Sequence, residues 1–201
     1  MEAAHTDTTG AAGTPDPAAT SQAPAHAATA RLTVHSPQEM QELGRALARL
    51  LRPGDLVMLT GELGAGKTTL TRGLGEGLGV RGAVTSPTFV IARVHPSLDA
   101  GPPLVHVDAY RLGSFAEVED LDLEASLEEA VTVVEWGEGK AEGLAPDRLE
   151  VVLRRARGGE SRPASGGGAD ARSVTVRPVG TRWHGTDLAA ALLGRPDLWP
   201  G

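Results

Sequence analysis

Hydrophobic positions divide the chain into alternating strand-like and helix-like segments. Residues 31–35 alternate between apolar and polar side chains, as a half-buried strand does. Residues 36–51 start with a capping-box pattern at Ser36 and Glu39, with Pro37 at the first helical position. The apolar side chains of this segment fall on one helical face, at Met40, Leu43, Leu47, Leu50 and Leu51. The pattern therefore predicts a strand followed by an amphipathic helix.

Short apolar runs predict three strands that are buried on both faces, at residues 55–60, 104–108 and 131–135. A glycine-rich loop follows the first run, and residues 67–78 then have helical character. An acidic segment, residues 114–127, is expected to be helical in part. Strands that alternate with helices in this way predict a layered α/β domain with a mainly parallel central sheet.

The remaining segments extend this sheet. Residues 84–94 predict a loop that runs into a strand. Residues 148–155 and 173–177 predict a hairpin that adds antiparallel strands at one edge, with the polar, Gly-rich residues 157–172 as its flexible loop. The last segment, residues 181–201, is expected to be a C-terminal tail with a short helix near residues 186–193.

Composition limits the class of protein. The chain has 201 residues, 40% of them hydrophobic, which is enough for one sizeable core. Residues 1–30 are rich in Ala and Thr and hold no large apolar side chain after Met1, so they are expected to be a disordered extension. They lack the features of a signal peptide, and no long apolar run follows, so we expect a cytoplasmic protein without membrane contact.

Charge and cysteine content exclude further classes. A net charge of -7 argues against a chain that mainly coats nucleic acid, because such binding needs clustered Lys and Arg. The chain has no cysteine, which excludes disulfides, thiolate metal sites and thiol nucleophiles.

The loop after the first buried run carries the most specific motif. Residues 60–70 read TGELGAGKTTL and match the pattern G-x-x-x-x-G-K-[ST] of phosphate-binding loops. In such a loop backbone amides converge on phosphate oxygens, while Lys67 reaches the β and γ phosphates and the Thr68 hydroxyl is placed to bind Mg²⁺. A Gly-rich surface turn is the alternative, but the preceding strand and following helix favour a phosphate site. Its expected residues are Gly61, Gly64, Ala65, Gly66, Lys67, Thr68 and Thr69.

Two acids, Asp108 and Glu135, stand where two of the apolar runs end. The carboxyl ends of parallel strands are where such a sheet presents its ligand. Mg²⁺ bound to a triphosphate needs an acid there, and hydrolysis needs a group that orients the attacking water. Either acid alone could be a solvated strand cap, but the pair favours catalytic roles for Asp108 and Glu135 beside Lys67.

Three neighbouring residues have less specific interpretations. Thr88 follows Ser86 and Pro87 in a small loop that either senses the γ phosphate, as in nucleotide switches, or forms a plain turn. His106 shares a strand face with Asp108 and is expected to be a core histidine with satisfied hydrogen bonds. Trp136 is expected to pack near the mouth of the site.

Arginines gather around the predicted hairpin. Two interpretations remain open: a solvated edge that discourages strand pairing, which is the expected one, or a docking patch for an acidic partner or RNA. The arginines are Arg154, Arg155, Arg157, Arg162, Arg172 and Arg177.

The class of nucleotide enzyme follows from what else the chain contains. A GTPase needs an N-K-x-D element, and the chain has no Asn. A small P-loop kinase that phosphorylates a small molecule needs an acceptor-binding lid rich in Arg, whereas the arginines here lie in a hairpin. An ATPase whose hydrolysis drives a partner protein fits better, and the kinase stays as the alternative.

Four motifs together resemble the TsaE family, formerly YjeE. They are GELGAGKTT at 61–69, SPTF at 86–89, HVDAYRL at 106–112 and VEWGE at 134–138, in this order. The resemblance covers roughly residues 31–157. The Ala/Thr-rich start, the Gly-rich hairpin loop and the C-terminal tail depart from the usual short family pattern.

The resemblance implies a specific activity. It implies a P-loop ATPase domain, here residues 31–180, that binds ATP and takes part in forming threonylcarbamoyladenosine beside the anticodon of tRNA. It also implies that Thr68 and Glu135 hold Mg²⁺ and that Asp108 is needed for hydrolysis. In that family TsaE works with TsaB and TsaD, TsaD transfers the carbamoyl group, and hydrolysis by TsaE resets the complex. Contact with tRNA would be indirect or weak.

Overall fold

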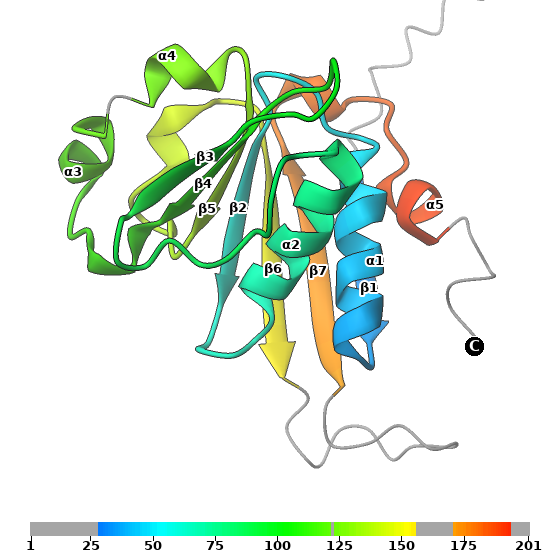
Figure 1. Ribbon diagram of the computed structural model, residues 1–201. Coiled ribbons are helices and arrows are strands. Elements are labelled where there is room, and N and C mark those ends of the chain that lie inside the picture. The colour runs from blue at the N-terminus through cyan, green and yellow to red at the C-terminus, as the bar shows by residue number, and fades with distance from the viewer. Residues whose placement is uncertain (1–27, 122, 156–170, 194–201) are drawn as a thin grey trace, which may run out of the picture.

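The computed structural model describes residues 28–121, 123–155 and 171–193. The predictions of a disordered extension and of a flexible hairpin loop concern residues that lie almost wholly outside these ranges. The described residues form a layered α/β structure with helices on both sides of one twisted sheet (Figure 1).

The sheet has seven strands in the order β1-β7-β6-β2-β5-β4-β3 (Figure 1). Strands β6, β2, β5 and β4 run parallel, whereas β1, β7 and β3 pair antiparallel with their neighbours. This confirms a mainly parallel centre with antiparallel edges. The strands are β1 (Ala30–Val34), β2 (Leu56–Gly61), β3 (Ala92–His95), β4 (Leu104–Asp108), β5 (Val131–Glu135), β6 (Arg148–Arg155) and β7 (Arg172–Val179).

The predicted hairpin of β6 and β7 forms, but it is not at the edge of the sheet. β1 pairs with β7 over its whole length and is itself the outermost strand. The expected edge position is therefore wrong by one strand. Local sequence patterns do not predict the pairing of β1 with β7, because these strands lie at opposite ends of the described chain.

Two long helices, α1 (Pro37–Ala48) and α2 (Lys67–Leu78), cover one face of the sheet, with α5 (Leu188–Leu193) beside α1 (Figure 1). The other face is covered over β2, β5 and β4 by the segment that contains α3 (Phe115–Glu119) and α4 (Glu124–Leu127). Each side therefore has its own apolar core. The Ser36 hydroxyl caps α1 by accepting from the Glu39 amide at 3.1 Å, as predicted.

Glycines allow α1 and α2 to pack in direct contact. A Cβ added at Gly44 would overlap the Leu70 carbonyl oxygen, and one at Gly73 would overlap the Gln41 carbonyl oxygen. These glycines are costly for helix formation, by roughly 1 kcal/mol each relative to alanine. The close backbone contact explains why α2 keeps Gly73.

The segment after β7 belongs to the packed structure. Trp183 is 1% exposed, and Leu188 of α5 is fully buried against the α1 side of the sheet. Arg182 donates to Asp55 at 3.1 Å and to the Leu50 carbonyl at 3.0 Å, which ties this segment to the start of β2. Residues 181–193 thus pack where a tail was expected. None of the helices in the described ranges has the length and apolar character that a membrane crossing requires.

Candidate nucleotide site

The glycine-rich loop leads from β2 directly into α2. Gly66 caps the helix with φ 108°, a left-handed conformation that glycine adopts without strain. Gly64 also has a positive φ, of 73°. The first amides of α2 have no partner within the helix, and they carry the positive end of its dipole. The loop therefore has the strand, turn and helix start that bind phosphate in other proteins.

Lys67 lies inside this loop. It is 4% exposed, and its Nζ donates to the carbonyls of Gly61 at 2.8 Å and Glu62 at 3.2 Å. Burial lowers the pKa of Lys67, and the negative charges of Glu135 and Asp108 act against that shift. The ammonium group is thus held by loop carbonyls in a partly desolvated position, where a phosphate would replace them as its partner.

The Trp136 ring covers the same ammonium group. Nζ of Lys67 lies 3.7 Å from the ring centroid, and the Tyr110 ring packs edge-on against Trp136 at 5.3 Å. Trp136 has φ 62°, a left-handed conformation that is unusual for a residue with a large side chain. This turn directly after β5 places the ring at the mouth of the site, as predicted.

Glu135 connects the loop to the sheet. The Thr68 hydroxyl donates to Oε1 of Glu135 at 2.9 Å and lies 3.2 Å from Oε2. On the other side, Nε2 of His106 lies 2.9 Å from Oε1 of the same carboxylate. Glu135 and His106 are 2% and 0% exposed. Partners on two sides therefore fix the position of the carboxylate.

Asp108 forms a second cluster beside it. β4 and β5 are neighbours, and their register places Asp108 directly opposite Glu135. Its Oδ2 accepts from the Thr88 hydroxyl at 2.5 Å and from the Ser86 hydroxyl at 3.1 Å, while Oδ1 accepts from the Tyr110 amide at 3.0 Å. The loop that contains Thr88 is thus anchored on the acid at the end of β4.

These side chains suit a magnesium ion bound together with phosphate. Among the described residues, no three His, Asp or Glu side chains come together as a metal cluster. A P-loop site needs no such cluster, because Mg²⁺ takes one or two protein oxygens and completes its shell with phosphate and water. Thr68 and Glu135 supply a hydroxyl and a carboxylate, both of the oxygen type that Mg²⁺ prefers.

Two contacts of the site had no clear signal in the sequence. His106 was expected to be a core histidine, and its contact with Glu135 depends on the order of β4 and β5. Arg155, at the end of β6, donates from Nη2 to the Gly64 carbonyl at 3.1 Å and so braces the phosphate loop. The alternation of His106 with Asp108 placed both on one strand face, but the cross-strand partner could not be read locally.

The fold and this loop define a protein of the P-loop class, with the phosphate loop at the carboxyl end of a central parallel strand. The profile of a family described as "Threonylcarbamoyl adenosine biosynthesis protein TsaE" matches residues 34–163. The chain therefore belongs to the TsaE family.

Individual relatives agree with this assignment. A Streptomyces coelicolor protein named tRNA threonylcarbamoyladenosine biosynthesis protein TsaE is 66% identical over 151 residues, 75% of this chain and 97% of that protein. A Bacillus subtilis protein of the same name is 38% identical over 150 residues, 74% of this chain and 85% of that protein. The crystal structure of Bacillus subtilis YdiB superposes with a TM-score of 0.62 at 31% identity, covering 85% of this chain and 97% of that one.

Proposed function

We propose that this protein is a Mg²⁺-dependent ATPase that supports threonylcarbamoyladenosine modification of tRNA together with TsaB and TsaD. The observation that carries the proposal is the contact between Thr68 and Glu135, because it joins the phosphate loop to an acid on a neighbouring strand. The membership in the TsaE family supplies the pathway. ATP binding and hydrolysis would drive the complex of the three proteins from one turnover to the next.

The loop provides the binding part of the reaction. Backbone amides from Gly64 to Thr69 would hold the phosphates of ATP, and Lys67 would exchange its carbonyl partners for β and γ phosphate oxygens. Thr68 and Glu135 would hold Mg²⁺, which neutralises charge that develops on the phosphates during transfer. His106 would keep the Glu135 carboxylate pointed at that position.

Asp108 provides the hydrolytic part. It lies opposite Glu135 at the ends of adjacent strands, and in the proposed complex the terminal phosphate of ATP would lie beside it. A carboxylate there can accept a hydrogen bond from the attacking water and so orient it in line with the bond that breaks. The Thr88 hydroxyl donates a hydrogen bond to Asp108. A γ phosphate bound beside Asp108 would therefore change the contacts of the Thr88 loop, as it does in nucleotide switches.

Exposed apolar side chains around the site support the docking of a partner. Leu63 in the phosphate loop is 87% exposed, Phe89 beside Thr88 is 85% exposed, and Tyr110 against Trp136 is 63% exposed. Large apolar side chains gathered on a surface often mark protein interfaces. A partner bound here would touch the nucleotide site itself, which would couple hydrolysis to the assembly.

Complementation tests the proposal. The gene is expressed in a bacterial strain depleted of its own TsaE, and threonylcarbamoyladenosine in the tRNA is measured by mass spectrometry. We expect the modified nucleoside to return with the wild-type gene and not with the Asp108→Asn variant. In parallel, the purified chain should release inorganic phosphate from ATP slowly, and faster with TsaB and TsaD; transfer of phosphate to a small acceptor instead would support the kinase alternative.

A further inference from the structure

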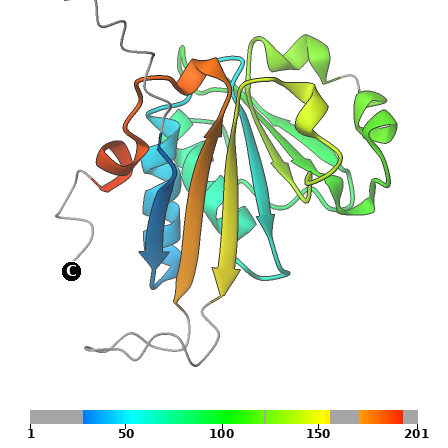
Figure 2. The ribbon, with the colours of Figure 1, turned by 180° about the vertical axis from the view of Figure 1, so that it is seen from behind.

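A basic face lies on the side of the sheet away from α1 and α2. It is built by the outward residues of β1, β7 and β6, which include four arginines and a single acid, Glu150. This is a marked local excess in a chain with a net charge of -7. In Figure 2 these three strands face the viewer, and no helix of the described residues crosses them. We call this surface, formed by the outward residues of β1, β7 and β6, the basic face.

Strand alternation decides which arginines belong to it. Inward positions such as Leu149, Val151 and Val174 are buried in the core under α1 and α2. The residues between them therefore point outward. The outward arginines are Arg31, Arg148, Arg154 and Arg177.

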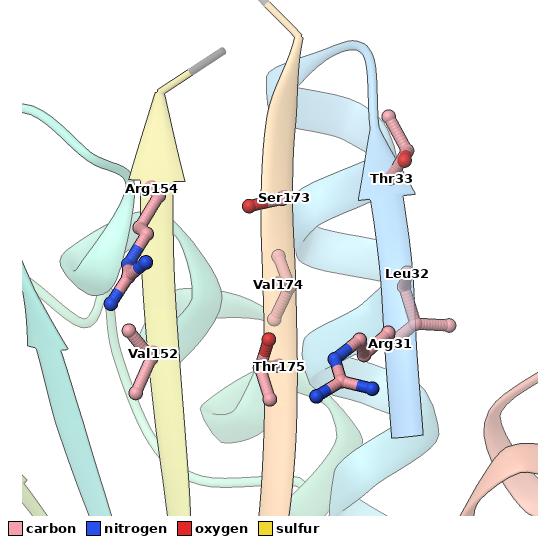
Figure 3. Close-up of a pocket in the computed structure, with 8 residues that line it drawn as sticks. All are labelled: Arg31, Leu32, Thr33, Val152, Arg154, Ser173, Val174 and Thr175. Carbon is pink, nitrogen blue, oxygen red and sulfur yellow. The ribbon is translucent and has the colours of Figure 1, made fainter. Parts of the chain in front are cut away.

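Two of these arginines have no acidic partner among the described residues. Glu150 is the only acid of the three strands, and its carboxylate is engaged by Arg148 at 2.9 Å and by Arg177 from the opposite strand. Arg31 and Arg154 are both exposed, and neither forms a salt bridge within the described ranges. In Figure 3 the Arg31 guanidinium extends from β1 toward Thr175 of β7, and the Arg154 guanidinium lies beside Val152 of β6. The free positive charge is thus concentrated at these two positions.

The surface between the two arginines is hollowed and carries hydroxyl groups. A shallow groove of about 510 Å³ is lined by Arg31 and Arg154 and includes Thr33, Ser173 and Thr175 (Figure 3). Guanidinium groups and hydroxyls are the donors that proteins use most often on phosphate oxygens. The groove therefore presents donors for more than one phosphate along its length.

Protection of a sheet edge accounts for Arg31 at most, because Arg31 lies on the edge strand β1. Arginines at an edge discourage pairing with another chain. However, β7 lies between β1 and β6, and β6 lies between β7 and β2, so of these three strands only β1 is at an edge of the sheet. Arg154 and Arg177 stand on interior strands, where no unpaired backbone needs protection.

We infer that the basic face binds the sugar–phosphate backbone of RNA, with Arg31 and Arg154 as its main phosphate contacts. The choice of RNA rests on the proposed function in tRNA modification, while the site itself rests on the charge and shape of the face. The three strands contain no aromatic residue, so they offer no aromatic platform for base stacking. Binding should therefore depend on backbone charge and show little sequence preference.

An acidic protein partner fits the face less well. Stable protein interfaces usually bury aromatic and arginine anchors together in well-packed pockets, and the three strands offer arginines but no aromatic residue. The outward apolar side chain between the two arginines is Val152, which is short and half-buried. A surface of arginines and hydroxyls without such an anchor is typical of phosphate contact.

A binding experiment on the full chain tests the inference. The probe is an unmodified, fluorescein-labelled tRNA transcript, with binding followed by fluorescence anisotropy in the absence of ATP and over a range of salt concentrations. The variant Arg31→Gln/Arg154→Gln should bind roughly tenfold more weakly, and the salt dependence of log K should become less steep by about 1 to 2. The matched control Arg52→Gln/Arg81→Gln removes two exposed arginines from connecting turns and should bind like the wild type.

Three results would overturn the inference. The wild type could show no salt-dependent binding, the control pair could weaken binding as much as the test pair, or the test pair could keep tRNA binding and lose co-elution with TsaB and TsaD. The last result would assign the face to a protein partner.

ATP hydrolysis is measured on the same samples, and the test pair should hydrolyse ATP like the wild type. A failure of the ATPase proposal would appear in every sample, so the RNA-binding result could still be interpreted.

Discussion

The imidazole Nε2 of His106 lies 2.9 Å from Oε1 of Glu135, on adjacent parallel strands and out of contact with solvent. The same Oε1 accepts from the Thr68 hydroxyl at the start of α2. One carboxylate oxygen therefore links the phosphate loop, β5 and β4. This link explains how the sheet can hold the magnesium ligands of the proposed ATPase in a fixed position before a nucleotide arrives.

Removing the His106 side chain should lower Mg²⁺-dependent ATP hydrolysis more than it lowers the affinity for ATP. In His106→Leu, Glu135 loses its partner on β4, and we expect kcat to fall about tenfold to a hundredfold while the Mg²⁺ concentration for half-maximal activity rises. His106→Gln keeps a donor and should recover part of the loss. The control is Thr132→Val. Thr132 lies on β5, and its buried hydroxyl has no hydrogen-bond partner, so this variant should behave like the wild type. Equal losses in His106→Leu and Thr132→Val would indicate a packing effect only.

The Thr68 hydroxyl should be needed for hydrolysis, whereas the methyl group should not. Thr68→Val keeps the shape of the side chain and removes the donor to Glu135, so Mg²⁺-dependent phosphate release should fall about a hundredfold or more. Thr68→Ser keeps the hydroxyl and should retain most of the activity. Steady-state phosphate release at saturating Mg²⁺ distinguishes the two, and similar activity in both variants would remove Thr68 from the proposed metal site.

The two strand-end acids should separate binding from hydrolysis. Glu135→Ala and Asp108→Asn should each lose ATP hydrolysis, because one removes the proposed metal ligand and the other removes the proposed acceptor for the attacking water. ATP affinity, measured by equilibrium dialysis, should stay largely intact, since in the proposed site the loop amides and Lys67 supply the phosphate contacts. Full turnover in either variant would exclude that acid from the mechanism.

Gly73 should be required for stability in spite of its low helix propensity. Alanine in a helix is favoured over glycine by about 1 kcal/mol, but a Cβ at Gly73 would overlap the backbone of α1 at Gln41. Overpacking of this kind costs roughly 1 to 3 kcal/mol, so Gly73→Ala should lower the free energy of unfolding. Gly113→Ala, whose Cβ would lie at an ordinary 3.5 Å from Glu117, serves as control in urea unfolding. A more stable Gly73→Ala would show that the helices can move apart freely.

His95 should make stability depend on pH. Burial lowers the pKa of His95, and the positive charges of His106 and Arg93 add to the shift, while a backbone hydrogen bond at Arg81 opposes it. As pH falls from about 6.5 through the folded pKa, the unfolded chain binds the proton more readily than the folded chain does, and the free energy of unfolding decreases.

Urea unfolding between about pH 7.5 and 5 checks this slope. The loss of stability toward low pH should be smaller in His95→Gln than in the wild type. The exposed His35 provides the matched control, and His35→Gln should follow the wild-type curve. Parallel curves for wild type and His95→Gln would contradict the expectation.

Elements with strong local signals agree with their sequence predictions. The predicted helix at residues 67–78 and strands at residues 104–108 and 131–135 coincide with α2, β4 and β5. Their apolar patterns end at loop residues, so their boundaries are encoded locally. The position of β1 beside β7 is not encoded in this way, because pairing between distant strands depends on the whole sheet. The sequence also gives no signal for the packing of Trp183, because a single aromatic residue in a short polar segment forms no periodic pattern.

The site follows the same division. The phosphate loop is a contiguous motif, and both strand-end acids could be placed from the apolar runs that precede them. The contact of His106 with Glu135 and that of Arg155 with Gly64 require knowledge of which strands are neighbours. Sequence spacing gives the face of a strand on which a residue lies, but the register between strands is fixed only by the folded sheet.

The position of β1 has a consequence for how the chain folds. β1 is the first strand of the described chain, and its only partner in the sheet is β7, the last strand. During synthesis β1 therefore has no strand to pair with until β7 has left the ribosome. Contacts between such distant segments slow folding, because a long loop must close before they form. A chain that stops after β6 could hold its phosphate loop and both acids, yet it would leave β1 without a place in the sheet.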